Sequence, residues 1–130
     1  MAFEYPADLQ YLDTHEYVRI EDDVATVGLS AFAIDQLGDI VFLELPAVDD
    51  EVEAGGTFGT IESVKAVEDL KSPVNGRVID CNKTLVDAPE AIADDPYNDG
   101  WLIKVRLNDP DAELEETMTA AEYAAQVEGD

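Results

Sequence analysis

Short stretches of alternating apolar and polar residues, each closed by a turn-forming pair or a proline, run through most of this sequence. Residues 17–21 and 24–28 alternate on either side of residues 22–23, two aspartates, which predicts a hairpin. Residues 40–45 form an apolar run that stops at Pro46, for which we expect a strand buried on both faces. Strands this short and this closely spaced predict a mainly β domain, a small antiparallel sandwich or flattened barrel.

The second half of the chain repeats this pattern. A glycine pair at 55–56 precedes an expected strand at 57–63. Residues 70–74 and 77–81 flank Asn-Gly at 75–76, the dipeptide that favours a type I′ turn, so we expect a tight hairpin there.

A loop rich in Pro and Asp is expected at 82–100, followed by an alternating strand at 101–107. We expect Trp101 and Phe42 to anchor the core. Cys81 is the single cysteine of the chain, so no intrachain disulfide is expected, and its apolar neighbours predict ordinary strand packing.

Two segments have helical patterns. Ser30 is placed to cap a short helix over 31–37, which Gly38 is placed to end. Apolar residues recur at helical spacing between 111 and 127, and Thr119 is a cap candidate midway, so we expect two short helices.

The charge of the chain is extreme: 31 acidic residues against seven basic ones give a net charge of −24. Because 46% of the residues are hydrophobic, this charge predicts an acidic shell around a normal core rather than disorder. We hypothesise a salt-rich, halophilic-type cytosol, in which salt screens the repulsion. Seven scattered cations exclude a basic track for nucleic acid, no run is long enough for a membrane span, and no signal-like segment is present, so we expect a cytoplasmic protein.

The residues do not suggest a catalytic constellation. His15 is the single imidazole, no glycine-rich phosphate loop precedes a helix, and 31 carboxylates are too many to nominate an acid–base pair. The segment 59–70 instead holds one lysine, Lys65, between two strand-like arms, followed by Ser-Pro-Val-Asn-Gly at 72–76.

At this point the chain resembles the glycine-cleavage H protein family. The resemblance covers nearly the whole chain and rests on six segments: Thr-His-Glu-Tyr-Val-Arg at 14–19, Val-Ala-Thr-Val-Gly at 24–28, Gln-Leu-Gly-Asp-Ile-Val-Phe-Leu-Glu-Leu-Pro at 36–46, Glu-Ser-Val-Lys-Ala at 62–66, Ser-Pro-Val-Asn-Gly at 72–76 and Asp-Pro-Tyr-Asn-Asp-Gly-Trp-Leu-Ile-Lys at 95–104. It implies one lipoyl-carrier domain over residues 1–130 with a helical extension from about 111. The implied fold is the hammerhead lipoyl-domain fold of two antiparallel sheets, with Lys65 at a hairpin tip.

The resemblance also implies a function. Lys65 would carry covalent lipoate, attached by a lipoate ligase or a lipoyl/octanoyl transferase. The chain would be a non-catalytic carrier that takes the aminomethyl group of glycine from a pyridoxal-phosphate (PLP) glycine decarboxylase to a tetrahydrofolate-dependent aminomethyltransferase. Dihydrolipoamide dehydrogenase would then reoxidise the arm. Glu16 and Asp69 occupy family positions that line a sheltering cleft, although each can equally be a solvated carboxylate. For His15 we expect a structural hydrogen bond rather than a role as general base.

The sequence leaves two other interpretations open and disfavours two more. A lipoate relay that donates lipoyl groups to other enzymes is the main alternative, and the sequence barely separates it from the glycine carrier. Biotin carriers usually have methionine on both sides of the lysine, where this chain has Val64 and Ala66. Lipoyl domains of 2-oxoacid dehydrogenases generally have aspartate before the lysine and belong to longer chains. The last alternative is an unmodified module whose acidic face binds a basic partner.

Overall fold

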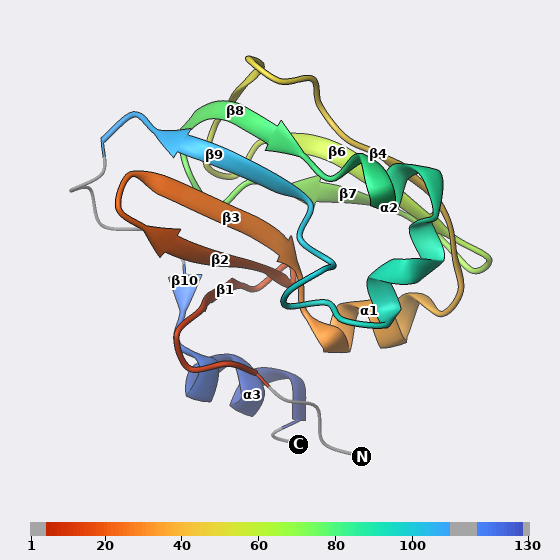
Figure 1. The fold of residues 1–130 in the computed structure, drawn as a ribbon. Coiled ribbons are helices and arrows are strands. Elements are labelled where there is room, and N and C mark those ends of the chain that lie inside the picture. Colours follow the sequence, from red (N-terminus) through yellow and green to blue (C-terminus); the bar gives the residue numbers. More distant parts are fainter. Residues whose placement is uncertain (1–4, 110–116, 129–130) are drawn as a thin grey trace.

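The chain folds into two antiparallel sheets that pack face to face, with helices at the ends (Figure 1). The computed structural model describes residues 5–109 and 117–128. Within them the larger sheet has the strand order β10-β1-β2-β3-β9-β8-β5 and the smaller β4-β6-β7. The predicted fold class is confirmed. The strands are β1 (Gln10–Leu12), β2 (Glu16–Glu21), β3 (Val24–Leu29), β4 (Ile40–Glu44), β5 (Glu51–Val52), β6 (Thr57–Ser63), β7 (Val67–Lys71), β8 (Gly76–Cys81), β9 (Ile103–Leu107) and β10 (Thr117–Met118), and the helices are α1 (Ala31–Leu37), α2 (Lys83–Asp87), the 3₁₀ helix η1 (Pro89–Ala93) and α3 (Ala120–Glu128).

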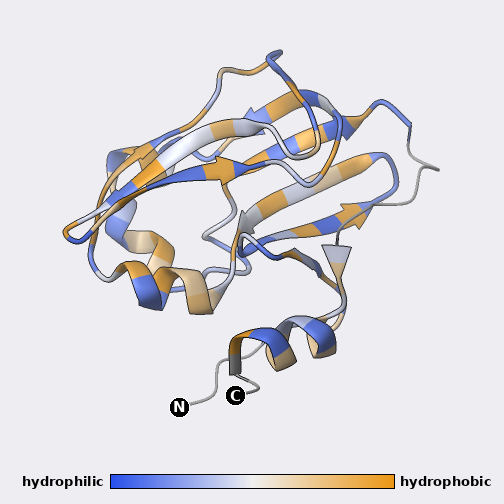
Figure 2. Ribbon diagram, turned by 180° about the vertical axis from the view of Figure 1, so that it is seen from behind, coloured by the Kyte–Doolittle hydropathy of each residue, from blue (hydrophilic) through white to orange (hydrophobic). Residues whose placement is uncertain are grey.

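The main core lies between the two sheets. Val27 and Val105 contribute from the larger sheet, and Leu43, Ile61 and Leu70 contribute from the smaller one. Apolar and polar residues alternate along many of these strands, so each sheet turns one face inward (Figure 2). The expected packing of Cys81 in this core is confirmed.

A second, smaller cluster of buried residues lies where α3 packs against β1, outside the main core (Figure 1). Its five buried members are Leu9, Tyr11, Tyr17, Ala120 and Tyr123. Three of these are tyrosines, so the cluster combines apolar packing with hydroxyl groups that need hydrogen-bond partners.

Local signals predicted the elements between residues 16 and 37 correctly, whereas the strand β1 was not predicted. The predicted hairpin is formed by β2 and β3, and Asp22 adopts a φ of 57° in its turn. The helix α1 spans the predicted residues: the side chain of Ser30 accepts a hydrogen bond from the amide of Ala33, and Gly38 ends the helix at a φ of 82°.

The strand β4 is not buried on both faces, which corrects the prediction for residues 40–45. Val41 is 51% exposed and Phe42 is 49% exposed, so Phe42 is not a core anchor. The reason is that β4 is an edge strand of the smaller sheet, with an irregular register between Ile40 and Phe42, and one face meets solvent. Trp101 is only partly buried, beneath the ammonium of Lys104 at 4.9 Å from the ring centroid.

The predicted hairpin at Asn75-Gly76 is also wrong, because β7 and β8 belong to different sheets. Gly76 is required for a close approach instead: a methyl group at its Cα would collide with the carbonyl oxygen of Arg106. The side chain of Asn75 accepts a hydrogen bond of 2.9 Å from the amide of Ala54. The Asn-Gly signal therefore marks the crossing between sheets rather than a tight turn.

The C-terminal half contains more helix than expected in one place. The segment 82–100, predicted as a loop, includes α2 and η1. Much of the first helix expected after 111 falls on residues outside the described ranges, and residues 117–118 are strand. The cap at Thr119 is confirmed, since its hydroxyl accepts from the amide of Glu122 at 3.2 Å and its amide donates to the Glu122 carboxylate at 2.9 Å. None of the helices in the described residues has the length and apolar character of a membrane span.

Candidate functional site

Lys65 lies in the turn that joins β6 to β7, exposed to solvent. The side chain of Ser63 organises this turn: its hydroxyl oxygen accepts hydrogen bonds of 3.1 Å from the amides of both Lys65 and Ala66. The backbone amide of Ser63 donates to the carbonyl of Ala66 at 2.8 Å. The lysine therefore protrudes from a turn whose backbone is fixed.

The hairpin also rests on the loop that follows α1. The amide of Val64 donates to the carbonyl of Asp39 at 3.1 Å. The aliphatic stem of Lys65 lies over Gly38, since a methyl group placed there would come within 3.5 Å of the lysine Cε. This distance is an ordinary van der Waals contact, so glycine is favoured at position 38 by its φ of 82° rather than by a lack of space.

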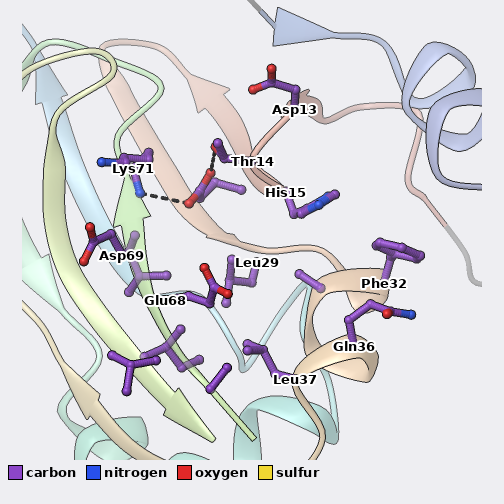
Figure 3. Close-up of a pocket in the computed structure, with 16 residues that line it drawn as sticks. Asp13, Thr14, His15, Leu29, Phe32, Gln36, Leu37, Glu68, Asp69 and Lys71 are labelled. Atoms are coloured by element: carbon purple, nitrogen blue, oxygen red, sulfur yellow. Dashed lines mark hydrogen bonds between the residues drawn. The ribbon is translucent and has the colours of Figure 1, made fainter.

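A cleft of about 750 Å³ opens beside this hairpin (Figure 3). Its walls come from three parts of the chain: the turn before β2, one side of α1, and the strand β7. Its lining residues are Asp13, Thr14, His15, Glu16, Leu29, Phe32, Ala33, Gln36, Leu37, Ile61, Ala66, Val67, Glu68, Asp69, Leu70 and Lys71. The cleft reaches the turn that carries the lysine because Ala66 and Val67 belong to its lining.

Glu16 is the buried acid of this cleft, with 1% of its surface exposed. Its carboxylate accepts a hydrogen bond of 2.8 Å from the amide of Lys71 and another from the hydroxyl of Thr14, both drawn in Figure 3. Burial raises the pKa of Glu16 to about 7, and these hydrogen bonds oppose that shift. A cation entering the cleft would favour the ionised form, because it would replace the lost hydration.

The other acids that line the cleft are exposed. Asp69 and Glu68 stand on β7, on the opposite wall, and Asp13 is the first residue of the turn before β2, on the same wall as Glu16. The ammonium of Lys71 donates to the hydroxyl of Thr57 at 2.8 Å. With four carboxylates on its walls, the cleft suits a small cation with an apolar stem.

His15 has the structural role that was expected. Its Nδ1 lies 2.7 Å from the hydroxyl of Tyr123, and its ring packs against Phe32 at 5.3 Å between centroids. Burial lowers the pKa of His15, against the opposing charges of Asp13 and Glu68. A neutral, hydrogen-bonded imidazole adds no positive charge to the cleft, so it does not offset the charge of the carboxylates.

The fold brings together what the sequence marked separately. Glu16 and Asp69, 53 positions apart in the sequence, line one cleft, and Lys65 immediately precedes Ala66, which also lines it. Sequence reasoning missed Ser63 and Thr14. A serine two positions before the lysine was a readable sign of a side-chain-stabilised turn, whereas nothing local indicated that Thr14 would contact Glu16.

Known proteins resemble this chain over its full length. The family model described as glycine cleavage H-protein matches residues 9–130. A glycine cleavage system H protein of Acaryochloris marina is 61% identical over 129 residues, covering 99% of this chain and 100% of that protein. One from Gloeothece citriformis is 62% identical, covering 100% and 99%. The crystal structure of a glycine cleavage system H protein from Mycobacterium marinum superposes with a TM-score of 0.87 at 39% identity, covering 94% of this chain and 98% of that one.

Proposed function

This chain belongs to the glycine cleavage H-protein family, and from that premise we propose that Lys65 is the residue that carries its lipoyl group. The chain is a lipoyl carrier of glycine cleavage. The observation that carries the assignment to Lys65 is its place: an exposed amine on a turn fixed by Ser63, next to residues that line an acidic cleft.

The residues present fit such a group. Acylation needs an amine that a modifying enzyme can reach, and Lys65 is exposed, with its stem over Gly38. Apolar side chains, among them Leu29, Leu37 and Ile61, line the cleft and suit a hydrocarbon arm. When bound, the lipoyl group supplies the disulfide that accepts the aminomethyl group.

We assign Glu16 and Asp69 different tasks in holding the cargo, which is the aminomethyl group on the lipoyl arm. The buried carboxylate of Glu16 is placed to accept a charge-assisted hydrogen bond from the ammonium end of the arm. The exposed carboxylate of Asp69 adds attraction from the opposite wall. By keeping water from the cargo, the cleft delays its hydrolysis between enzymes.

The remaining steps fall to partner enzymes, and the chain contributes tethering and shelter rather than catalysis. We propose the PLP glycine decarboxylase, the aminomethyltransferase and dihydrolipoamide dehydrogenase as its partners, with a lipoate ligase or transferase that modifies Lys65. Val64 and Val67, 67% and 62% exposed beside Lys65, offer an apolar contact within a strongly acidic surface. Interfaces with these partners are expected to be small and short-lived, since the carrier must leave each in turn.

In vitro acylation tests the attachment site. The unmodified chain is incubated with a lipoate ligase, ATP and lipoate, and the intact mass is measured. We expect one acyl group on the wild type and on Lys83→Arg, which changes an exposed lysine away from the cleft, and none on Lys65→Arg. Acylation of Lys65→Arg to the wild-type level would overturn the assignment.

A further inference from the structure

Tyr123, near the C-terminus, reaches the back of the cleft from α3. Its side chain is fully buried, and its hydroxyl lies 2.7 Å from Nδ1 of His15 and 2.7 Å from Oγ of Ser30. These partners are 108 and 93 positions away along the chain. One phenolic O–H donates to one partner and accepts from the other, so both contacts are satisfied at once.

On one side the hydroxyl holds the turn that presents Glu16. His15 adopts a φ of 84°, a conformation that costs energy for a residue with a side chain and must be held by its surroundings. Its amide donates to the carbonyl of Leu12, and its own carbonyl accepts from the amide of Ser30, both at 2.9 Å. Glu16, the next residue, begins β2 from this strained turn.

On the other side the hydroxyl holds α1. Ser30 caps this helix by accepting a hydrogen bond of 3.2 Å from the amide of Ala33. The helix in turn supplies Phe32, Gln36 and Leu37 to the cleft, as Figure 3 shows. A shift of Ser30 would therefore move the helix wall relative to Glu16.

Tyr123 is itself held in place. Its ring stacks on Tyr11 with centroids 4.8 Å apart and planes 9° apart. The helix that carries it begins at the reciprocal cap of Thr119 and Glu122. The bridge thus connects the cleft to a separate, packed cluster rather than to a mobile side chain.

We propose that Tyr123 is a positioning residue whose hydroxyl joins the two walls of the cleft from behind, so that α3 sets the fit of the cleft around the arm. The inference rests on the proposed function, in which the cleft shelters the cargo. It assigns the C-terminal helix a task beyond covering an edge of the fold. Tyr123 touches no cargo, and it acts through His15 and Ser30.

The test compares Tyr123→Phe with Tyr11→Phe. The two rings stack on each other, and each variant removes a single hydroxyl, but the hydroxyl of Tyr11 donates to the carbonyl of Pro6 at 3.0 Å, away from the cleft. In the protein without lipoate, NMR of the Glu16 carboxyl carbon follows its titration. We expect Tyr123→Phe to lower the pKa of Glu16 from about 7 toward its ordinary value, because water enters between the loosened walls. Tyr11→Phe should leave that pKa unchanged.

The second readout is hydrolysis of the aminomethyl cargo on the lipoylated protein. We expect about a tenfold faster release in Tyr123→Phe and the wild-type rate in Tyr11→Phe, a tenfold change being about 1.4 kcal/mol. Wild-type titration and hydrolysis in Tyr123→Phe would overturn the inference, as would equal shifts in the two variants. If Tyr123→Phe does not fold, Ser30→Ala breaks the same bridge from the other end, and an unchanged Glu16 titration there overturns it too.

A different result would count against the sheltering role in the proposed function. If Glu16→Gln leaves hydrolysis at the wild-type rate, the cleft does not shelter the cargo. A shift of the Glu16 titration in Tyr123→Phe still supports the bridge in that case, because this readout needs no arm.

Discussion

The two walls of the cleft hold their acids in opposite surroundings. Glu16 on the β2 side is buried, accepts hydrogen bonds from the Lys71 amide and the Thr14 hydroxyl, and directly follows the turn that Tyr123 contacts through His15. Asp69 on the β7 side is open to solvent. A buried, oriented carboxylate interacts strongly with a cation but is costly to ionise when the cleft is empty, whereas an exposed one costs little and contributes little. The wall with Glu16 is therefore suited to binding the cation, whereas the wall with Asp69 stays open to solvent.

The largest contrast between the walls is expected in the pH dependence of stability. The pKa of Glu16 is about 7 in the fold and near 4.5 when unfolded, so the folded state binds its proton more tightly. The contribution of Glu16 to the free energy of unfolding is therefore fully present below about pH 4.5 and is lost as the pH rises to about 7. Relative to Glu16→Gln, the wild type should lose about 3 kcal/mol of unfolding free energy across this window, measured by urea denaturation at fixed salt.

Asp69→Asn is the matched control for that series. As a surface substitution it should change the unfolding free energy by less than about 0.5 kcal/mol. A wild-type minus Glu16→Gln difference that stays flat between pH 4.5 and 7 would mean that Glu16 is solvated like Asp69.

The rate of cargo hydrolysis should also respond more to substitution of Glu16 than to substitution of Asp69. At pH 8, where Glu16 can ionise, Glu16→Gln should speed release about tenfold to a hundredfold, as expected for a charge-assisted hydrogen bond in a dry site. Asp69→Asn should speed it by about fivefold at most. Release of the cargo is followed by mass spectrometry, and a larger effect from Asp69→Asn would reverse the assignment of the walls.

Ser63→Ala tests whether the hydroxyl of Ser63 fixes the turn that carries Lys65. It leaves the amides of Lys65 and Ala66 without their acceptor, so we expect a loss of about 1 kcal/mol in stability and about fivefold slower acylation of Lys65. Ser72 makes a comparable turn contact, accepting from the amide of Val74 at 3.2 Å. Ser72→Ala should destabilise the fold similarly and leave acylation unchanged, and equal slowing in both variants would remove the special role of Ser63.

The smallest expected effect is that of salt on the hydrolysis rates of the two variants, and it should distinguish the exposed acid from the buried one. The screening length falls to about 3 Å at 1 M salt, which screens exposed charges far more than buried ones. The effect of Asp69→Asn on hydrolysis should disappear in 1 M KCl, while the effect of Glu16→Gln persists. Equal loss of both effects would show that Glu16 also acts through solvent.

Local signals in the sequence were sufficient where an element is specified by its own residues. Ser30 and Gly38 delimit α1, paired aspartates turn the β2–β3 hairpin, and Thr119 caps α3, because each of these residues acts on backbone groups beside it. The errors came where the partner is distant. Asn75-Gly76 has the composition of a hairpin turn, but it lies between strands of different sheets, and glycine is required there because the carbonyl of Arg106 in β9 lies too close for a side chain. Likewise, Phe42 is exposed because of where β4 lies in its sheet.

The candidate site shows the same division. Lys65 and the two acids were named from a resemblance, and the resemblance could not say that Glu16 is buried while Asp69 is exposed. That difference arises from contacts with Lys71, 55 positions away, and from a turn braced by Tyr123 at 108 positions from His15. The burial of Glu16 is a property of the packed chain and cannot be read from the residues beside it in the sequence.

The most direct test of the account is peptide mapping of the protein isolated from its native host. Trypsin does not cleave after an acylated lysine, so modification at Lys65 predicts a single peptide, 20–71, heavier by one lipoyl amide. The account predicts this peptide in the lipoylated fraction. Finding peptides 20–65 and 66–71 with no adduct, in a host whose other lipoyl proteins are modified, would contradict it.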